Sequence, residues 1–153
     1  MRMEIASKRS RQLDDIALAL PQRVSALVQV FFARTGTRLS RTELGLLAAL
    51  AARPHRITEL ALREGITQPA MTQLVNRLQV RGWVERDGHP GDGRVVLVKL
   101  TDSGRETLDS VRAEYRALLH EEMAALDDDE VETLATAIDI LDGLIERLGE
   151  RAP

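Results

Sequence analysis

The spacing of apolar residues in this chain changes at Gly82, from the period of a helix (about 3.6 residues) to the period of a β-strand (two residues). This change restricts the folds that the chain can adopt. Before that point, "TELALREGITQPAMTQLVNRL" carries apolar residues at helical spacing on both sides of Gly65. A glycine there allows a sharp turn between two helices. After it, "WVER" and "RVVLVKL" alternate as strands do, and "DGHPGDG" between them is a loop. The segment therefore predicts helix, tight turn, helix and β-hairpin.

Further helical patterns flank this segment. One runs from about 13 to 34, where Pro21 predicts a kink or a break. A capping box at Ser40 and Glu43 opens another. After the hairpin, "TDSGRETL" restarts a helix, with Thr101 or Ser103 as its cap, and a heptad seam runs from 131 to 148. The pattern predicts a mainly α winged helix-turn-helix with a small β-hairpin wing in residues 39–100, between an N-terminal helical segment (1–38) and C-terminal helices (101–153).

Charge is segregated along the chain, although the formal net charge is only −3. Residues 1–38 hold seven Lys/Arg against three Asp/Glu, and residues 39–100 hold nine against six. Residues 101–153 hold five against fifteen. A basic first part is compatible with a nucleic-acid partner, while acidic helices that merely solubilise the C-terminus remain an alternative.

The second helix of the turn motif exposes amides, hydroxyls and a guanidinium but no carboxylate. In a winged helix-turn-helix this helix enters the major groove, where base edges offer donors and acceptors and phosphates repel carboxylates. Gln or Asn there can pair bidentately with adenine. The polar face therefore predicts a double-stranded DNA partner, and an ordinary solvated helix face is the alternative.

These motifs together resemble the MarR family of bacterial transcription regulators. The resemblance covers about 13–148 and rests on the turn motif, the wing "DGRVVLVKLT" and "LTDSG" opening the next helix. It implies a homodimer, with an N-terminal dimerisation helix (1–38) and C-terminal dimerisation helices (101–153) on either side of a DNA-binding domain (39–100). It also implies a pseudo-palindromic operator, repression of transcription, and an arginine of the wing in the minor groove. The residues it assigns to DNA binding are Gln68, Ala70, Thr72, Gln73, Asn76, Arg77, Arg86, Asp92 and Arg94.

The same resemblance, with the apolar stripes, predicts the residues that join two copies. They are Ile16, Leu20, Leu108, Val111, Tyr115, Val131, Leu134, Ile138, Leu141 and Ile145. Many relatives bind small effectors between the dimer helices and the winged module. Here Arg23, Phe31, Phe32 and Tyr115 are the candidate lining, with interface core as the alternative for the aromatic residues.

Catalysis is not expected, because the acidic pairs are explained by helix ends and no nucleophile triad, phosphate loop or metal signature is present. The chain has no Cys, and we expect no cofactor. His120 beside Glu121 and Glu122 is the best metal candidate, so a metal-responsive regulator stays an alternative, as does a winged-helix protein-interaction adaptor. Without a run of 18 apolar residues or a secretory signal, we expect a cytoplasmic protein with no membrane partner.

Overall fold

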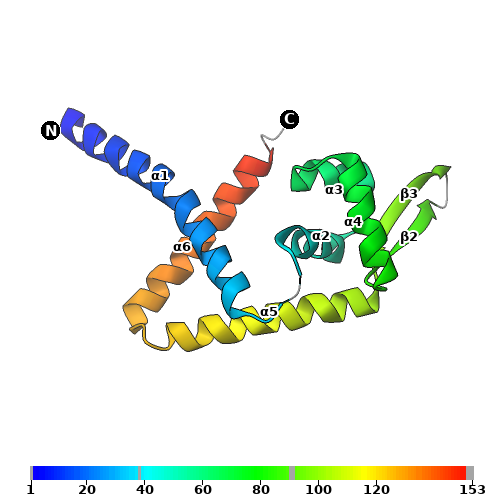
Figure 1. Cartoon of the computed structure of the whole chain (residues 1–153). Coiled ribbons are helices and arrows are strands. Elements are labelled where there is room, and N and C mark those ends of the chain that lie inside the picture. The colour runs from blue at the N-terminus through cyan, green and yellow to red at the C-terminus, as the bar shows by residue number, and fades with distance from the viewer. Residues whose placement is uncertain (1, 38, 90–91, 151–153) are drawn as a thin grey trace. The chain divides into compact units, whose positions relative to one another are not determined.

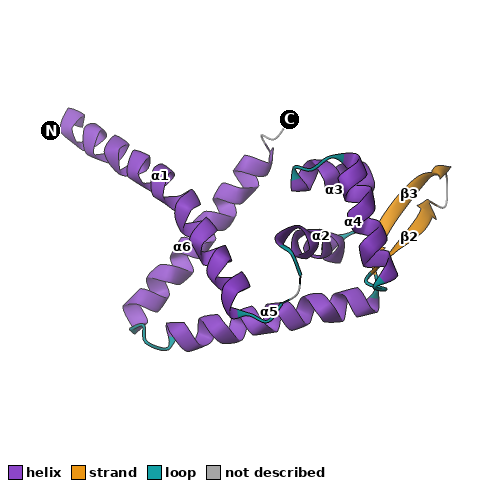
Figure 2. Ribbon diagram, in the orientation of Figure 1, coloured by secondary structure: helices purple, strands orange, loops and turns teal. Residues whose placement is uncertain are grey.

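The computed structural model describes the backbone of residues 2–37, 39–89 and 92–150, and the side chains of residues 8–37, 39–87 and 96–149. Its elements, in chain order, are α1 (Arg2–Arg34), α2 (Arg41–Ala52), β1 (His55–Arg56), α3 (Ile57–Glu64), α4 (Gln68–Val80), β2 (Val84–His89), β3 (Asp92–Leu100), α5 (Asp102–Met123) and α6 (Asp128–Glu150) (Figure 1). The strands form one antiparallel sheet of order β1-β3-β2, and the rest is mainly helical (Figure 2). The predicted fold class is confirmed.

Local signals begin and end the helices of the winged module as predicted. Ser40 Oγ accepts from the Glu43 amide at 3.2 Å, and Glu43 Oε2 accepts from the Ser40 amide at 2.8 Å. Gly65 ends α3 with φ of +65°, a conformation that a side chain disfavours. Thr67 Oγ1 then accepts from the Ala70 amide and begins α4. These bonds satisfy backbone groups that helix ends leave without a partner.

The core of the winged module is aliphatic. Its largest fully buried side chains come from α2, α3, α4, β3 and α5, and they are Leu46, Leu47, Leu60, Met71, Val75, Leu78, Val98 and Leu108. Burial of one such side chain contributes roughly 1.5–3 kcal/mol. The apolar face of α4 is therefore held against the module, and its polar face is left outward.

Two features of the backbone differ from the sequence expectation. Pro21 lies inside a continuous α1, so the predicted break is wrong, and the helix begins near Arg2 instead of Leu13. Proline removes a single amide donor, and the flanking residues are good helix formers, so the helix continues around it. The strand β1 was not predicted: His55 pairs with Val98 of β3, and its Nδ1 lies 3.0 Å from Glu59 Oε2. Two residues are too few to show a period.

The first turn of α5 packs against Gly82 and Trp83, which follow α4. Thr101 donates its amide to the Trp83 carbonyl at 3.1 Å and its hydroxyl to the Gly82 carbonyl at 2.6 Å. Thr101 Oγ1 also accepts from the Gly104 amide, so Thr101 is the cap. Gly104 is buried so closely that a Cβ there would lie 2.0 Å from the Trp83 carbonyl oxygen. This glycine is therefore required for the close approach of α5.

The chain divides into two compact units, Met1–Glu114 and Tyr115–Pro153. This division falls inside α5. Leu108 and Val111, on the first half of that helix, are only 1% and 5% exposed and belong to the core of the first unit. They have almost no surface left for a second copy, so we remove them from the predicted dimer interface.

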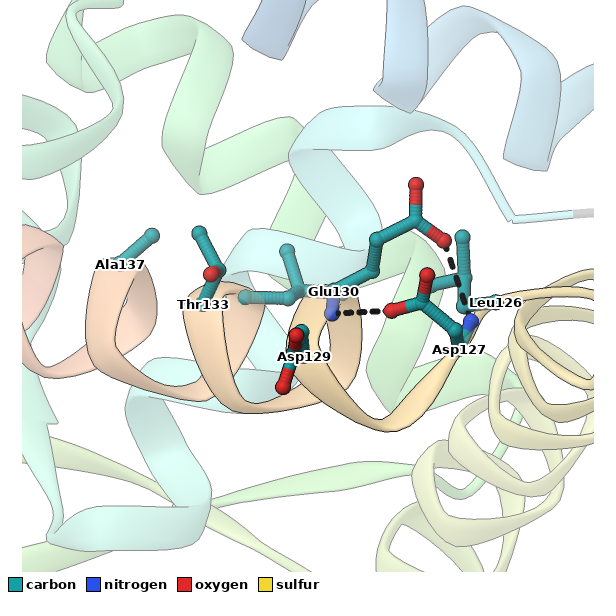
Figure 3. Close-up of a pocket in the computed structure, with 7 residues that line it drawn as sticks. Leu126, Asp127, Asp129, Glu130, Thr133 and Ala137 are labelled. Carbon is teal, nitrogen blue, oxygen red and sulfur yellow. Dashed lines mark hydrogen bonds between the residues drawn. The ribbon is translucent and has the colours of Figure 1, made fainter.

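The second unit contains the start of α6, where a further capping box forms. Asp127 Oδ1 accepts from the Glu130 amide at 2.8 Å, and Glu130 Oε2 accepts from the Asp127 amide at 3.1 Å (Figure 3). A pocket beside this cap has Leu126, Thr133 and Ala137 in its lining. Along α6 most of the heptad seam is exposed, with Ile138 at 51%.

The length and mean hydropathy of Lys8–Arg34 also meet the criteria for a membrane-crossing helix. The expectation of no membrane partner rested on the lack of an uninterrupted apolar run, which is a stricter test. Length and composition do not separate a membrane span from a helix covered by protein.

Candidate nucleic-acid interface

The helix α4 presents one apolar face and one polar face. Met71, Leu74, Val75 and Leu78 are buried. Of the polar face, Thr72 is half-buried and the remaining predicted contacts, Gln68, Ala70, Gln73, Asn76 and Arg77, are exposed. The fold therefore brings all six predicted residues of this helix to one outward surface. Between Gln68 and Val80 that surface contains no carboxylate.

Hydrogen bonds within the chain fix two of these side chains. Thr72 donates its hydroxyl to the Gln68 carbonyl at 2.9 Å, which leaves its oxygen as an acceptor toward solvent. Arg86 Nη2, on β2, donates to Asn76 Oδ1 at 2.7 Å. The resemblance predicted only that Arg86 contacts DNA, whereas the structure places its guanidinium against Asn76.

The far end of α4 is anchored by a cluster that the sequence did not reveal. Glu43 is 6% exposed on α2, and its Oε1 accepts from Arg81 Nη1 at 3.0 Å. The Arg81 guanidinium in turn lies 5.0 Å from the centre of the Trp83 ring. A cation over an aromatic face and a partly buried ion pair both fix orientation. The cluster thus links the start of α2 to the end of α4.

The environment of Glu43 keeps its carboxyl ionised. Burial alone would raise the pKa of Glu43, but the hydrogen bonds from Ser40 and the charges of Arg81 and Arg77 more than offset it. The pKa of Glu43 is therefore below its ordinary value of 4.5. The ionised form can accept from Ser40 and Arg81 through separate oxygens.

Glu43→Gln should lower the free energy of unfolding by about 1–3 kcal/mol at neutral pH. The amide has one oxygen, so its nitrogen would face either the Ser40 amide or the Arg81 guanidinium, both donors. Because the folded-state pKa of Glu43 is depressed, its stabilising contribution is complete above pH 4.5 and is lost as the pH falls through the folded-state value. Chemical unfolding followed by Trp83 fluorescence, at neutral and successively acidic pH, measures both effects.

The control for this variant is Glu106→Gln, which removes an exposed carboxylate on α5. It should change the free energy of unfolding by no more than about 0.5 kcal/mol. An acid dependence that is equally steep in the wild type and in Glu43→Gln would show that the Glu43 carboxyl does not couple α2 to α4.

The wing is the hairpin of β2 and β3, with Val84 opposite Leu100 and Arg86 opposite Val98. Across it, Lys99 forms an ion pair with Asp87, which raises the pKa of Lys99 and neutralises the Asp87 charge. The predicted wing residues Asp92 and Arg94 have side chains outside the described residues, as does His89. Their assignment to the minor groove stays a prediction.

A pocket of about 520 Å³ lies in the first unit, with Leu39, Trp83, Glu106, Val111 and Glu114 in its lining. The predicted effector residues Arg23, Phe31 and Phe32 do not line it. Tyr115 begins the other unit. This pocket therefore differs in position from the effector site that the family resemblance indicated.

For the metal alternative, no group of three or more His, Cys, Asp or Glu side chains within the described residues could hold a metal ion. His120 and its acidic neighbours Glu121 and Glu122 lie on α5 in the second unit and do not form such a group. The described geometry gives a metal-responsive regulator no support.

Comparison with known proteins agrees with this geometry. Residues 39–95 match the family model of the MarR family. An HTH-type transcriptional regulator of Mycobacterium tuberculosis is 33% identical over 138 residues, which are 90% of this chain and 94% of that protein. The HTH-type transcriptional repressor YetL of Bacillus subtilis is 26% identical over 131 residues, covering 84% of this chain and 76% of that protein.

The fold comparison points the same way. The crystal structure of wild-type MarR from Escherichia coli, in its apo form, has a TM-score of 0.65 and 26% sequence identity, and covers 84% of this chain and 96% of that chain. These relatives are transcriptional regulators and not enzymes, in agreement with the lack of a catalytic motif in the sequence. The turn motif, the outward polar face of α4, the hairpin wing and these similarities together show that the chain belongs to the MarR family of winged helix-turn-helix transcriptional regulators.

Proposed function

We propose that the protein is a homodimeric regulator that binds a pseudo-palindromic operator in duplex DNA and represses transcription in the cytoplasm. The observation that carries this proposal is the outward face of α4, which offers amides, a hydroxyl and a guanidinium without a carboxylate. Base edges and phosphates are the partners such a face suits. Repression is supported by the similarity to a protein named as a transcriptional repressor.

Exposed apolar surface supports the homodimer. In the single chain Ile16 of α1 and Val131, Ile138 and Ile145 of α6 are each about half exposed or more. The three α6 side chains belong to one seam of that helix, and a contiguous exposed apolar stripe marks an interaction site. A second copy is the favoured occupant because a two-fold dimer presents two α4 helices to the two halves of a pseudo-palindrome. Leu20, Leu134, Leu141 and Tyr115 stay in the proposed interface.

The polar residues of α1 favour a protein partner over a membrane. Gln22, Ser25 and Gln29 are spaced by three and four, so they share one side of the helix. Ile16, Val24 and Leu27 lie on the other side together with Arg23, and Leu18 is the apolar exception on the polar side. A helix in lipid is apolar all around, whereas a helix with one apolar face is covered on that face alone. We therefore assign α1 to the dimer and propose no membrane partner.

The wing completes the proposed DNA contact. The hairpin of β2 and β3 follows α4 directly and carries Asp92 and Arg94 on its second strand. A guanidinium is attracted to the negative potential of a narrow A·T-rich minor groove. We propose that Arg94 enters this groove on the flank of the operator and that Asp92 steadies it.

A small-molecule effector is part of the proposal, with two candidate positions. The pocket of the first unit touches Trp83, whose ring lies beneath Arg81 at the end of α4. A ligand in contact with Trp83 would therefore act on the anchor of the recognition helix. Arg23, Phe31, Phe32 and Tyr115 remain the candidate from the family resemblance.

Substitutions on α4 test the DNA-binding function. Gln73→Ala should cost about 1–3 kcal/mol on the preferred duplex and less on a random duplex, because it removes a base contact. Arg77→Ala should weaken both by similar amounts, because phosphate contacts carry no sequence information. The preferred duplex is selected with the full-length protein from a library with a randomised centre, and affinities are then measured over a salt series.

The protein-interaction adaptor predicts a different result. An adaptor would select no sequence and would show no salt-dependent affinity for duplex DNA, which would reject the proposed function. Both variants change exposed side chains, so unchanged helical content by circular dichroism is the control for folding.

A further inference from the structure

The hydrogen bond between Arg86 and Asn76 joins the wing to the recognition helix at the proposed DNA surface. Val84 and Arg86 are two residues apart on β2 and so share one face of the strand. Val84 is buried in the module, which directs Arg86 toward α4 as well. Both Arg86 and Asn76 are exposed, and the bond between them measures 2.7 Å.

This contact determines which end of the Asn76 amide faces the wing. A guanidinium has five N–H donors and no acceptor, so only the oxygen of Asn76 can meet it. A distance of 2.7 Å is at the short end for such bonds and is typical of a charged donor. Asn76 Oδ1 keeps a second lone pair, but that lone pair lies beside the guanidinium, whereas the Nδ2 group points to the other side of the amide and can only donate.

The neighbouring charge also changes which base Asn76 can accept. The bidentate contact of Asn with adenine requires Oδ1 to accept from the adenine N6 amino group while Nδ2 donates to N7. With Arg86 at Oδ1, the amino hydrogens would approach a cation. Guanine instead presents two acceptors, O6 and N7, in the major groove. Nδ2 of Asn76 and a further N–H of Arg86 are both donors and suit them together.

We propose that Arg86 is a positioning residue that makes Asn76 a donor, and that the base read at this position is guanine in preference to adenine. The inference rests on the proposed function, since it concerns the DNA contact of α4. It differs from the bidentate pairing with adenine that an unpartnered Asn can make. Gln73, one turn away, has no such partner fixed on it in the described structure and keeps both donor and acceptor.

The test starts from the preferred duplex selected with the full-length wild type. The position read by Asn76 is the base pair whose identity ceases to matter in Asn76→Ala. Competition binding then compares five duplexes, which carry each of the four base pairs or deoxyinosine at this position. The wild type should bind guanine about tenfold more tightly than adenine. Deoxyinosine, which keeps O6 and N7, should bind as guanine does.

Arg86→Ala should abolish or reverse this preference, because it frees Asn76 Oδ1 to accept from adenine. Arg86→Lys keeps a charged donor and should retain the order of the bases. Arg77→Ala, which removes an equal charge from α4, should lower the affinity for all the duplexes without changing their order. A change of base preference separates positioning from a simple loss of phosphate contact.

The contrary results are distinct from failure of the proposed function. Three results would each overturn the inference while DNA binding stands. The wild type could prefer adenine at this position, the guanine preference could survive Arg86→Ala, or Asn76→Ala could leave the preference unaltered at every base pair. A wild type that selects no sequence from the library would instead reject the proposed function, and the inference with it.

Discussion

Gly104→Ala is expected to destabilise the protein by about 3 kcal/mol or more, at the upper end of the range for overpacked sites. The added methyl would lie 2.0 Å from the Trp83 carbonyl oxygen and 2.8 Å from Leu100 Cδ1. The carbonyl belongs to the backbone and also accepts the Thr101 amide, so it cannot turn aside cheaply. Either α5 moves away from the end of α4 or the hairpin shifts. Urea unfolding followed by Trp83 fluorescence measures the loss.

Gly36→Ala is the matched control, because a Cβ at Gly36 meets nothing within 4 Å. Its free energy of unfolding should change by less than about 1 kcal/mol. Equal unfolding midpoints for Gly104→Ala and the wild type would mean that α5 does not rest on the Trp83 carbonyl in solution. The cap formed by Thr101 would then have to be reassigned as well.

Ile138→Asp should convert the proposed homodimer to monomers. Ile138 is at the middle of the seam from Val131 to Leu148, and it is 51% exposed in the single chain. A two-fold interface would bury the new carboxylate twice without a partner, which costs several kcal/mol. The chain's own fold should survive, because Ile138 is not part of its core. Light scattering at roughly micromolar concentration gives the mass, and circular dichroism gives the helical content.

Ile140→Asp offers a control of the same chemistry on the opposite side of α6. Ile140 is 59% exposed and lies about 200° around the helix from Ile138. This variant should remain dimeric. Dimers of both variants, or monomers of both, would show that the seam does not form the interface.

Much of the candidate site was determined by the sequence because its causes are local. The capping box of Ser40 and Glu43, the turn at Gly65 and the cap at Thr67 each involve residues within a few positions of one another. The helical period of α4 also determined which side is buried. Gln73 and Arg77 could therefore be placed on the outward face without knowledge of the tertiary structure.

Other features depended on contacts between residues far apart in the chain. Hydrophobic period predicts that Leu108 and Val111 are covered but not by what, and the tertiary structure gives them to the core of the first unit. The bond from Arg81 to Glu43 spans 38 positions, and no local pattern marks either residue as the other's partner.

The chemical character of the proposed DNA surface also has local and long-range causes. The sequence alone placed Asn76 on the polar face of a recognition helix and, from its side chain, allowed it to donate and accept. The return of the chain through β2 put Arg86 against its oxygen. Side-chain type and helical period are properties of the sequence, whereas the partner that fixes an amide is set by which strand folds back beside it. The tertiary structure therefore decided which end of that amide faces Arg86.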